Sequence, residues 1–190
     1  MSGNDYFPDA LQLGLAALQR EKAGALPPVE RWNPAHCGDI NIRIARDGRW
    51  FHEGKLIQRR ELVRLFSTLL RKDAEGYVLV TPAEKLRITV EDAPFQAALL
   101  DVEGEGSAQK LAFTTNVGDV TVAGADNVLR VVTDPQSGEP SPYVHVRAGL
   151  EARLSRAVFY QLADLAVPGP EENMLGVWSA GLFFVLGKAR

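Results

Sequence analysis

Two segments of this chain share one order of residue types, and that internal echo limits the possible folds more than any other feature. Each begins with a stretch that ends in histidine, Trp50-Phe51-His52 in the first and Tyr143-Val144-His145 in the second. Each continues through an arginine, Arg59 or Arg153, into apolar residues at helical spacing. These residues are Leu62, Leu65, Phe66 and Leu69 in the first segment and Leu154, Val158, Leu162 and Leu165 in the second. Both segments therefore predict a strand, a short turn and an amphipathic helix.

The echo indicates an internal duplication of a small domain. Two copies are too few for a solenoid, because stacked repeats need at least about three units to bury a continuous core. In a chain of 190 residues, a duplication instead predicts two small domains. Ligands often bind where two domains meet, so a binding site is expected between the halves.

The hydrophobic pattern outside the echo predicts short antiparallel strands in both halves. The residues from Ile40 to Ile44 alternate strictly between apolar and polar, and Asp47-Gly48 suits the tight turn of a hairpin. Further strands are expected at 77–80, 86–90, 98–103, 110–115, 120–122, 129–133, 143–147 and 175–186, and helices at 9–22, 59–72 and 153–165. The expected fold class is α+β, with two small domains from an internal duplication that each combine antiparallel strands with one helix.

The expected domain boundaries follow from these elements. We expect an N-terminal amphipathic helix and linker over residues 1–33, an N-terminal α+β domain over residues 34–95 and a C-terminal α+β domain over residues 96–190. The C-terminal half has several strands before its one helix, so its sheet is expected to curl into a small sandwich or a partial barrel.

Composition and charge exclude several classes of protein. A net charge of −3 gives no basic surface for duplex nucleic acid. The single Cys37 rules out an intramolecular disulfide and a cysteine-based zinc site. No segment reaches the roughly 18 consecutive apolar residues of a membrane span, and the first residues do not follow the pattern of a signal peptide. We therefore expect a cytoplasmic protein.

Arg59 and Arg153 lie close to the predicted starts of their helices, where the helix dipole disfavours a cation. One explanation is an anionic ligand, bound by the guanidinium groups and by free backbone N–H groups. The other is that each arginine pairs with a nearby carboxylate, Glu61 or Glu151. The residue pattern leaves both explanations open.

Two polar loops are further candidates for ligand contacts, and each also has a purely structural interpretation. Thr81-Pro82-Ala83-Glu84 matches a capping box, but the alternation that resumes at Leu86 leaves room for one helical turn at most. Asn116 and Asp119 lie in a turn where their side chains would either hold a hydroxyl or phosphate group or stabilise the turn alone.

The sequence favours binding over catalysis. His52 and His145 are expected to be hydrogen-bonded structural residues, because no metal-ligand spacing accompanies them. Val177 stands where a nucleophile elbow around Ser179 needs glycine, and Gly104-Glu105-Gly106 has no lysine for a P-loop. No catalytic residue, metal ligand or cofactor is therefore assigned.

Several longer strings are distinctive, and they are spread over residues 33–187. They are Asn33-Pro34, Cys37-Gly38-Asp39-Ile40, Asp47-Gly48-Arg49-Trp50-Phe51, Leu65-Phe66, Val80-Thr81-Pro82-Ala83-Glu84-Lys85, Val90-Glu91-Asp92-Ala93-Pro94-Phe95, Phe113-Thr114-Thr115-Asn116-Val117-Gly118-Asp119, Pro142-Tyr143-Val144-His145-Val146-Arg147 and Trp178-Ser179-Ala180-Gly181. Together they resemble the bacterial domain-of-unknown-function family 1285. The resemblance implies a two-domain fold with a duplicated core and a C-terminal part similar to pleckstrin-homology domains. It also implies a cleft between the domains for a nucleotide-like ligand and a part in bacterial signalling, and it implies no catalytic residues.

The favoured function is a cytoplasmic bacterial binding module for a small anionic, nucleotide-like ligand at the domain interface, with a role in signal transduction. Arg59 and Arg153 would face the anion, and Trp50 or Tyr143 would offer a stacking surface. The other candidate ligand contacts are Thr81, Glu84, Asn116, Asp119 and Arg147. Two alternatives stay open. One is a protein-interaction module that binds another protein or a second copy of the chain, and the other is a hydrolase of phosphoesters or nucleotides.

Overall fold

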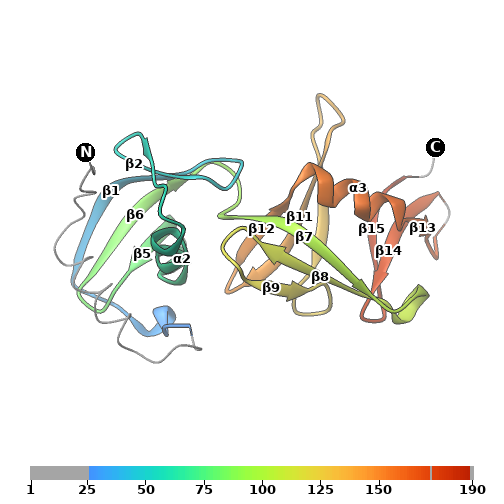
Figure 1. Cartoon of the computed structure of the whole chain (residues 1–190), viewed down its shortest axis with the longest axis horizontal. Coiled ribbons are helices and arrows are strands. Elements are labelled where there is room, and N and C mark those ends of the chain that lie inside the picture. Colours follow the sequence, from blue (N-terminus) through green and yellow to red (C-terminus); the bar gives the residue numbers. More distant parts are fainter. Residues whose placement is uncertain (1–25, 172, 189–190) are drawn as a thin grey trace. The chain divides into compact units, whose positions relative to one another are not determined.

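The computed structural model describes residues 26–171 and 173–188. The chain falls into two compact units that part between Glu91 and Asp92, and each unit is described by itself (Figure 1). The helix that the sequence predicts over residues 9–22 lies outside the described residues. Among the described residues, no helix is long and apolar enough to cross a membrane.

The N-terminal unit is built on one six-stranded sheet with the order β3-β2-β1-β6-β5-β4. Strands β1 and β6 run parallel at its centre, and every other neighbouring pair is antiparallel. The elements of this unit are η1 (Val29–Arg31), β1 (His36–Ile44), β2 (Trp50–His52), β3 (Lys55–Leu56), α2 (Arg60–Thr68), β4 (Leu70–Asp73), β5 (Gly76–Val80) and β6 (Glu84–Val90).

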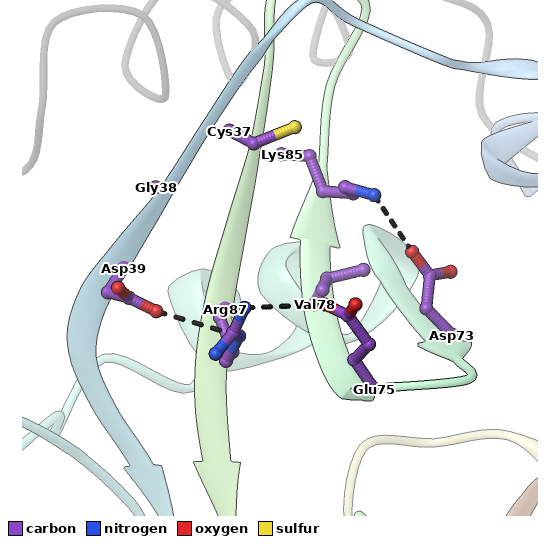
Figure 2. A pocket seen from close by; sticks show the side chains of 8 residues that line it. All are labelled: Cys37, Gly38, Asp39, Asp73, Glu75, Val78, Lys85 and Arg87. Atoms are coloured by element: carbon purple, nitrogen blue, oxygen red, sulfur yellow. Dashed lines mark hydrogen bonds and ion pairs between the residues drawn. The ribbon is translucent and has the colours of Figure 1, made fainter.

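Helix α2 covers one face of this sheet and closes the core of the unit. Phe66 on α2 is fully buried, and its ring stacks on Trp50 of β2 with 6.2 Å between the ring centroids. Strand β6 alternates, so Leu86 is buried while Lys85 and Arg87 point to the opposite face. Figure 2 shows these two cations on the side of the sheet that faces away from the helix.

The C-terminal unit combines a curled six-stranded sheet, in the order β10-β11-β12-β7-β8-β9, with a three-stranded sheet in the order β13-β14-β15. Buried Ser179 joins the two sheets, because its hydroxyl accepts from the Leu111 N–H and donates to the Ala123 carbonyl. The elements are β7 (Phe95–Glu103), η2 (Gly106–Ala108), β8 (Lys110–Thr115), β9 (Val120–Val122), β10 (Leu129–Thr133), β11 (Pro140–Arg147), β12 (Leu150–Leu154), α3 (Arg156–Asp164), β13 (Val167–Pro168), β14 (Met174–Ser179) and β15 (Leu182–Lys188).

The six-stranded sheets of the two units have the same plan. Each consists of two three-stranded meanders that meet in one central parallel pair, β1 with β6 in the first unit and β7 with β12 in the second. Helix α2 lies between the meanders in chain order, whereas α3 follows both. The predicted fold class is therefore confirmed: two sheet-rich halves, each with one helix, and a curled sheet in the second half.

The echoed segments share local structure but occupy different places in the two sheets. Both form strand, tight turn, strand and helix: β2, β3 and α2 in one unit, and β11, β12 and α3 in the other. Strand β3 is an edge strand of its sheet, whereas β12 lies at the centre of the other sheet, beside β7. The order of the strands thus shows the duplication. The echoed segments do not occupy equivalent strands, because β2 and β3 belong to the first meander of their sheet and β11 and β12 to the second meander of theirs.

Three predicted elements need correction. The helix predicted over 59–72 ends at Thr68, because residues 70–73 form β4 and pair with β5. The helix predicted over 153–165 begins at Arg156, after Ser155 accepts the Val158 N–H as its N-cap. The strand predicted over 175–186 is a hairpin, since Ala180 and Gly181 both have positive φ angles and form a turn between β14 and β15.

Candidate functional site

A hollow with a volume of about 260 Å³ lies on the face of the N-terminal sheet opposite α2. Strands β1, β4, β5 and β6 and the turn between β4 and β5 form it. Its lining is dominated by charged side chains (Figure 2). The lining residues are Cys37, Gly38, Asp39, Asp73, Glu75, Val78, Lys85 and Arg87.

Strand register explains why these side chains meet. In the parallel pair β1–β6, Cys37 lies opposite Lys85 and Asp39 lies opposite Arg87. Residues two apart on a strand share a face, so both rows point into the hollow. On the other side of β6, Val78 of β5 lies opposite Arg87 and provides the apolar floor.

One end of the hollow carries an excess of positive charge. Arg71 donates to both carboxylate oxygens of Asp73, at 2.7 and 3.1 Å. The Lys85 ammonium lies 3.2 Å from the same carboxylate. Two cations thus share one carboxylate, and Lys85 has N–H donors left for a ligand. Arg71 itself is held in place because it also donates to the carbonyls of Val29 and Trp32.

Asp73→Asn should destabilise the N-terminal unit at neutral pH and do so less at low pH. Hydrogen bonding from Arg71 is the main cause that holds the pKa of Asp73 below its ordinary value of 3.8, and Lys85 adds to it against the effect of burial. A carboxylate with a lowered pKa contributes stability that is complete above the unfolded-state pKa and is lost as the pH falls through the folded-state value. We expect a loss of about 1–3 kcal/mol at pH 7, because Arg71 is largely buried.

Urea denaturation at pH 7 and at about pH 2.5 measures this difference, because the unfolded state binds the proton at the lower pH and the stabilisation from the charged carboxylate shrinks as the pH falls. Exposed Asp101 offers a control substitution, Asp101→Asn, with little effect at either pH. A loss of equal size at both pH values would show that the Asp73 carboxylate charge does not stabilise the fold.

The other end of the hollow carries an excess of negative charge. Arg87 lies between Asp39 and Glu75, with nitrogen–oxygen distances of 3.6 and 3.4 Å. Both carboxylates are more than three-quarters exposed, and Arg87 is more than half exposed. These are long, solvated ion pairs, which contribute about 0–1 kcal/mol each and exchange partners readily.

Of the predicted ligand contacts in the N-terminal unit, Thr81 and Glu84 lie together and are buried. The Thr81 hydroxyl accepts from the backbone N–H groups of Ala83 and Glu84, so the predicted capping box forms a turn into β6 without a helix. The Glu84 side chain points to the face opposite Lys85, and its Oε1 has no hydrogen-bond partner. Arg59 is the N-cap residue of α2 and is exposed, and no described contact joins it to this pair.

In the C-terminal unit, Arg153 and Tyr143 are paired with a carboxylate that the sequence did not assign to them. Arg153 lies in β12 rather than at a helix start, directly opposite Tyr143 of β11. Arg153 Nη1 and the Tyr143 hydroxyl each donate to Asp92, both at 2.7 Å. Glu151, the expected partner of Arg153, instead accepts two hydrogen bonds from Arg130. Pairing with a carboxylate therefore accounts for Arg153.

The remaining predicted contacts, Asp119, Arg147 and Asn116, lie around Phe95 and β7. Arg147 forms an ion pair with Asp119 and places its guanidinium 4.9 Å from the centre of the Phe95 ring. The Asn116 side chain accepts from the Gln96 N–H, which holds its turn against β7. These contacts fasten turns to strands within the unit.

His145 is hydrogen-bonded, as predicted. Its Nδ1 donates to the Asp126 carbonyl at 3.0 Å, and its Nε2 accepts from the Gly149 N–H at 3.1 Å. The Nε2 contact stabilises the β11–β12 turn, and the Nδ1 contact holds the loop between β9 and β10. In residues 26–171 and 173–188, no group of three or more His, Cys, Asp or Glu side chains is arranged to hold a metal ion.

Comparison with family models accounts for nearly the whole described chain. Residues 27–93 match the N-terminal domain of DUF1285, a domain of unknown function, and residues 94–186 match the C-terminal domain of DUF1285. The chain belongs to the DUF1285 family. No curated protein matches it.

Two solved DUF1285 structures are similar to this chain. The crystal structure of a DUF1285 family protein from Silicibacter pomeroyi is 50% identical, with a TM-score of 0.83 over 92% of this chain and 95% of that one. A DUF1285 family protein from Shewanella baltica is 26% identical, with a TM-score of 0.49 over 66% of this chain and 91% of that one.

Sequence reasoning did not single out the hollow of this DUF1285 protein. The alternation of charged and apolar residues along β6 indicates that Lys85 and Arg87 face outward. The alternation does not indicate that β1 pairs in parallel with β6. This pairing places Cys37 beside Lys85 and Asp39 beside Arg87. Of the eight predicted ligand contacts, the structure joins Thr81 to Glu84, Asp119 to Arg147, and Tyr143 to Arg153 through Asp92. The predicted site between the halves stays a prediction.

Proposed function

We propose that this DUF1285 protein binds a small anionic ligand in the hollow of its N-terminal sheet, through Lys85 and Arg87. The observation that carries the proposal is the pair of cations two residues apart on β6, both facing the hollow. An ammonium and a guanidinium group at this spacing suit a phosphate or a carboxylate group.

Both cations are able to bind a ligand without loss of the fold. The contacts of Arg87 to Asp39 and Glu75 are long and exposed, so little stability is lost when an anion replaces them. Lys85 shares Asp73 with Arg71, and Asp73 therefore keeps a cation when Lys85 turns to a ligand.

The size and lining of the hollow restrict the ligand. Its volume of about 260 Å³ is below the roughly 300–1,000 Å³ of sites for drug-sized molecules. Its eight lining residues include no aromatic side chain on which a nucleobase would stack. The proposed ligand is therefore a small phosphate ester or carboxylate rather than a whole nucleotide. Such binding would serve the role in signal transduction that the family resemblance implies, which stays a prediction.

Calorimetric titration of the full chain with inorganic phosphate, propyl phosphate and succinate tests the proposal. At least one probe should bind, and Lys85→Gln or Arg87→Gln should weaken it about tenfold or more, since a charge-assisted hydrogen bond contributes about 1.5–3 kcal/mol. At 100 times its dissociation constant, the same probe should stabilise the fold by about 2.7 kcal/mol in thermal unfolding.

Two control variants make the result specific. Lys110→Ala removes an exposed cation of β8 in the other unit and should leave binding unchanged. Arg59→Ala removes a cation that the sequence analysis placed next to the anion. If the probe binds in the hollow, its affinity for this variant should also be unchanged. Loss of binding in Arg59→Ala alone would refute the hollow as the site.

Failure of all three probes to bind would refute the proposal and favour the protein-interaction alternative. The surface for such an interaction would be the outer face of β7, β8 and β9. There Leu99, Thr114 and Val120 form one cross-strand row, and Leu99 and Val120 are both more than half exposed.

A further inference from the structure

The charges around the hollow are separated along its length. At the Lys85 end, two cations, Lys85 and Arg71, surround the single carboxylate of Asp73. At the Arg87 end, two carboxylates, Asp39 and Glu75, surround a single cation. The hollow therefore has a positive end and a negative end, although these three cations and three carboxylates cancel in sum.

Unused hydrogen-bonding atoms lie at both ends. Lys85 contacts Asp73 through one ammonium group that has three N–H donors. Asp39 contacts Arg87 through Oδ1, and Glu75 contacts it through Oε2. No described contact is made by the second oxygen of either carboxylate, so each is available to accept a hydrogen bond from a ligand.

From this separation we infer that the ligand is a zwitterion, with its anionic group at Lys85, toward which Arg87 turns, and an ammonium group at Asp39 and Glu75, which Arg87 releases. The inference rests on the proposed function, since it assigns the ligand class of the same hollow. Lys85 and Arg87 lie two residues apart, and such rows are separated by roughly 7 Å along a strand. A phosphate and an amine joined by a three-carbon chain span a distance of this order.

The matched pair of probes is 3-aminopropyl phosphate and propyl phosphate, which differ in the terminal ammonium group. Calorimetric titration of the full chain should show the amine binding about threefold to fivefold more tightly, the gain expected of one exposed ion pair. In the double variant Asp39→Asn with Glu75→Gln, the two probes should bind alike. Lys85→Gln should weaken both probes by the same factor.

The outcomes separate this inference from the proposed function. Equal affinity of the two probes for the unmodified chain, or tighter binding of propyl phosphate, overturns the zwitterion and leaves an anion site in place. A preference for the amine that persists in the double variant overturns the role of Asp39 and Glu75. Binding of neither probe, nor of phosphate or succinate, overturns the proposed function together with the inference.

Discussion

Phe66→Ala should lower the free energy of unfolding of the N-terminal unit by about 3–5 kcal/mol, the range for truncation of a buried phenylalanine. Phe66 is fully buried beneath the sheet and stacks on Trp50, which is also buried. The substitution removes the main contact of α2 with the core and leaves a cavity, because neighbouring strands are held by their ladder and relax little.

Urea denaturation followed by tryptophan fluorescence measures the loss, and hydrogen exchange at the amides of β5 and β6 assigns it to the N-terminal unit. Leu56→Ala is the matched control, since Leu56 lies on the edge strand β3 and is 43% exposed. It should cost less than about 0.5 kcal/mol. A loss below about 1 kcal/mol for Phe66→Ala would mean that α2 does not close this core.

Asp92→Ala should destabilise the C-terminal unit by about 2–4 kcal/mol. The carboxylate accepts hydrogen bonds from the Tyr143 hydroxyl and from Arg153, and the side chains of Asp92 and Arg153 are only 15% and 20% exposed. Removing one partner of a largely buried pair leaves an uncompensated charge, which costs more than the pair contributes. Arg153 would keep its weaker contact to the Ser141 hydroxyl.

The phenol of Tyr143 provides a second measurement of the same substitution. Burial raises the pKa of Tyr143, and the hydrogen bond to Asp92 raises it further. The pKa of Tyr143 should therefore fall in Asp92→Ala, as followed by ultraviolet absorbance during alkaline titration. The control is Glu151→Ala, which breaks the more exposed pair with Arg130 and should cost about 1 kcal/mol or less. Equal losses for Asp92→Ala and Glu151→Ala would contradict a structural role for the Asp92 pair.

This structural role bears on the anion site that the sequence favoured. An anion at Arg153 would have to displace Asp92 from a contact of 2.7 Å. The cations of the hollow have longer contacts, and Arg87 is largely exposed. Of the two arrangements, the hollow thus needs the smaller rearrangement to accept a ligand.

Much of the strand pattern was predictable because it depends on neighbouring residues. Strict alternation predicted that Ile42 and Ile44 are buried, and Asp47-Gly48 predicted the turn that follows. The helix over 59–72 was predicted too long because its end depends on pairing with another strand rather than on neighbouring residues. Residues 70–73 follow directly on a helical stripe, and only their pairing with β5 makes them a strand.

The sequence by itself determined which faces of the strands are apolar and where the tight turns fall. These features depend on residues a few positions apart, whose side chains alternate or repeat with the geometry of the backbone. Tertiary structure alone decided which charges are neighbours. Asp39 and Arg87 are 48 residues apart and Asp92 and Arg153 are 61 apart, and parallel strand pairing brings each couple together. Such pairings minimise the free energy of the whole sheet, so no local pattern specifies the site.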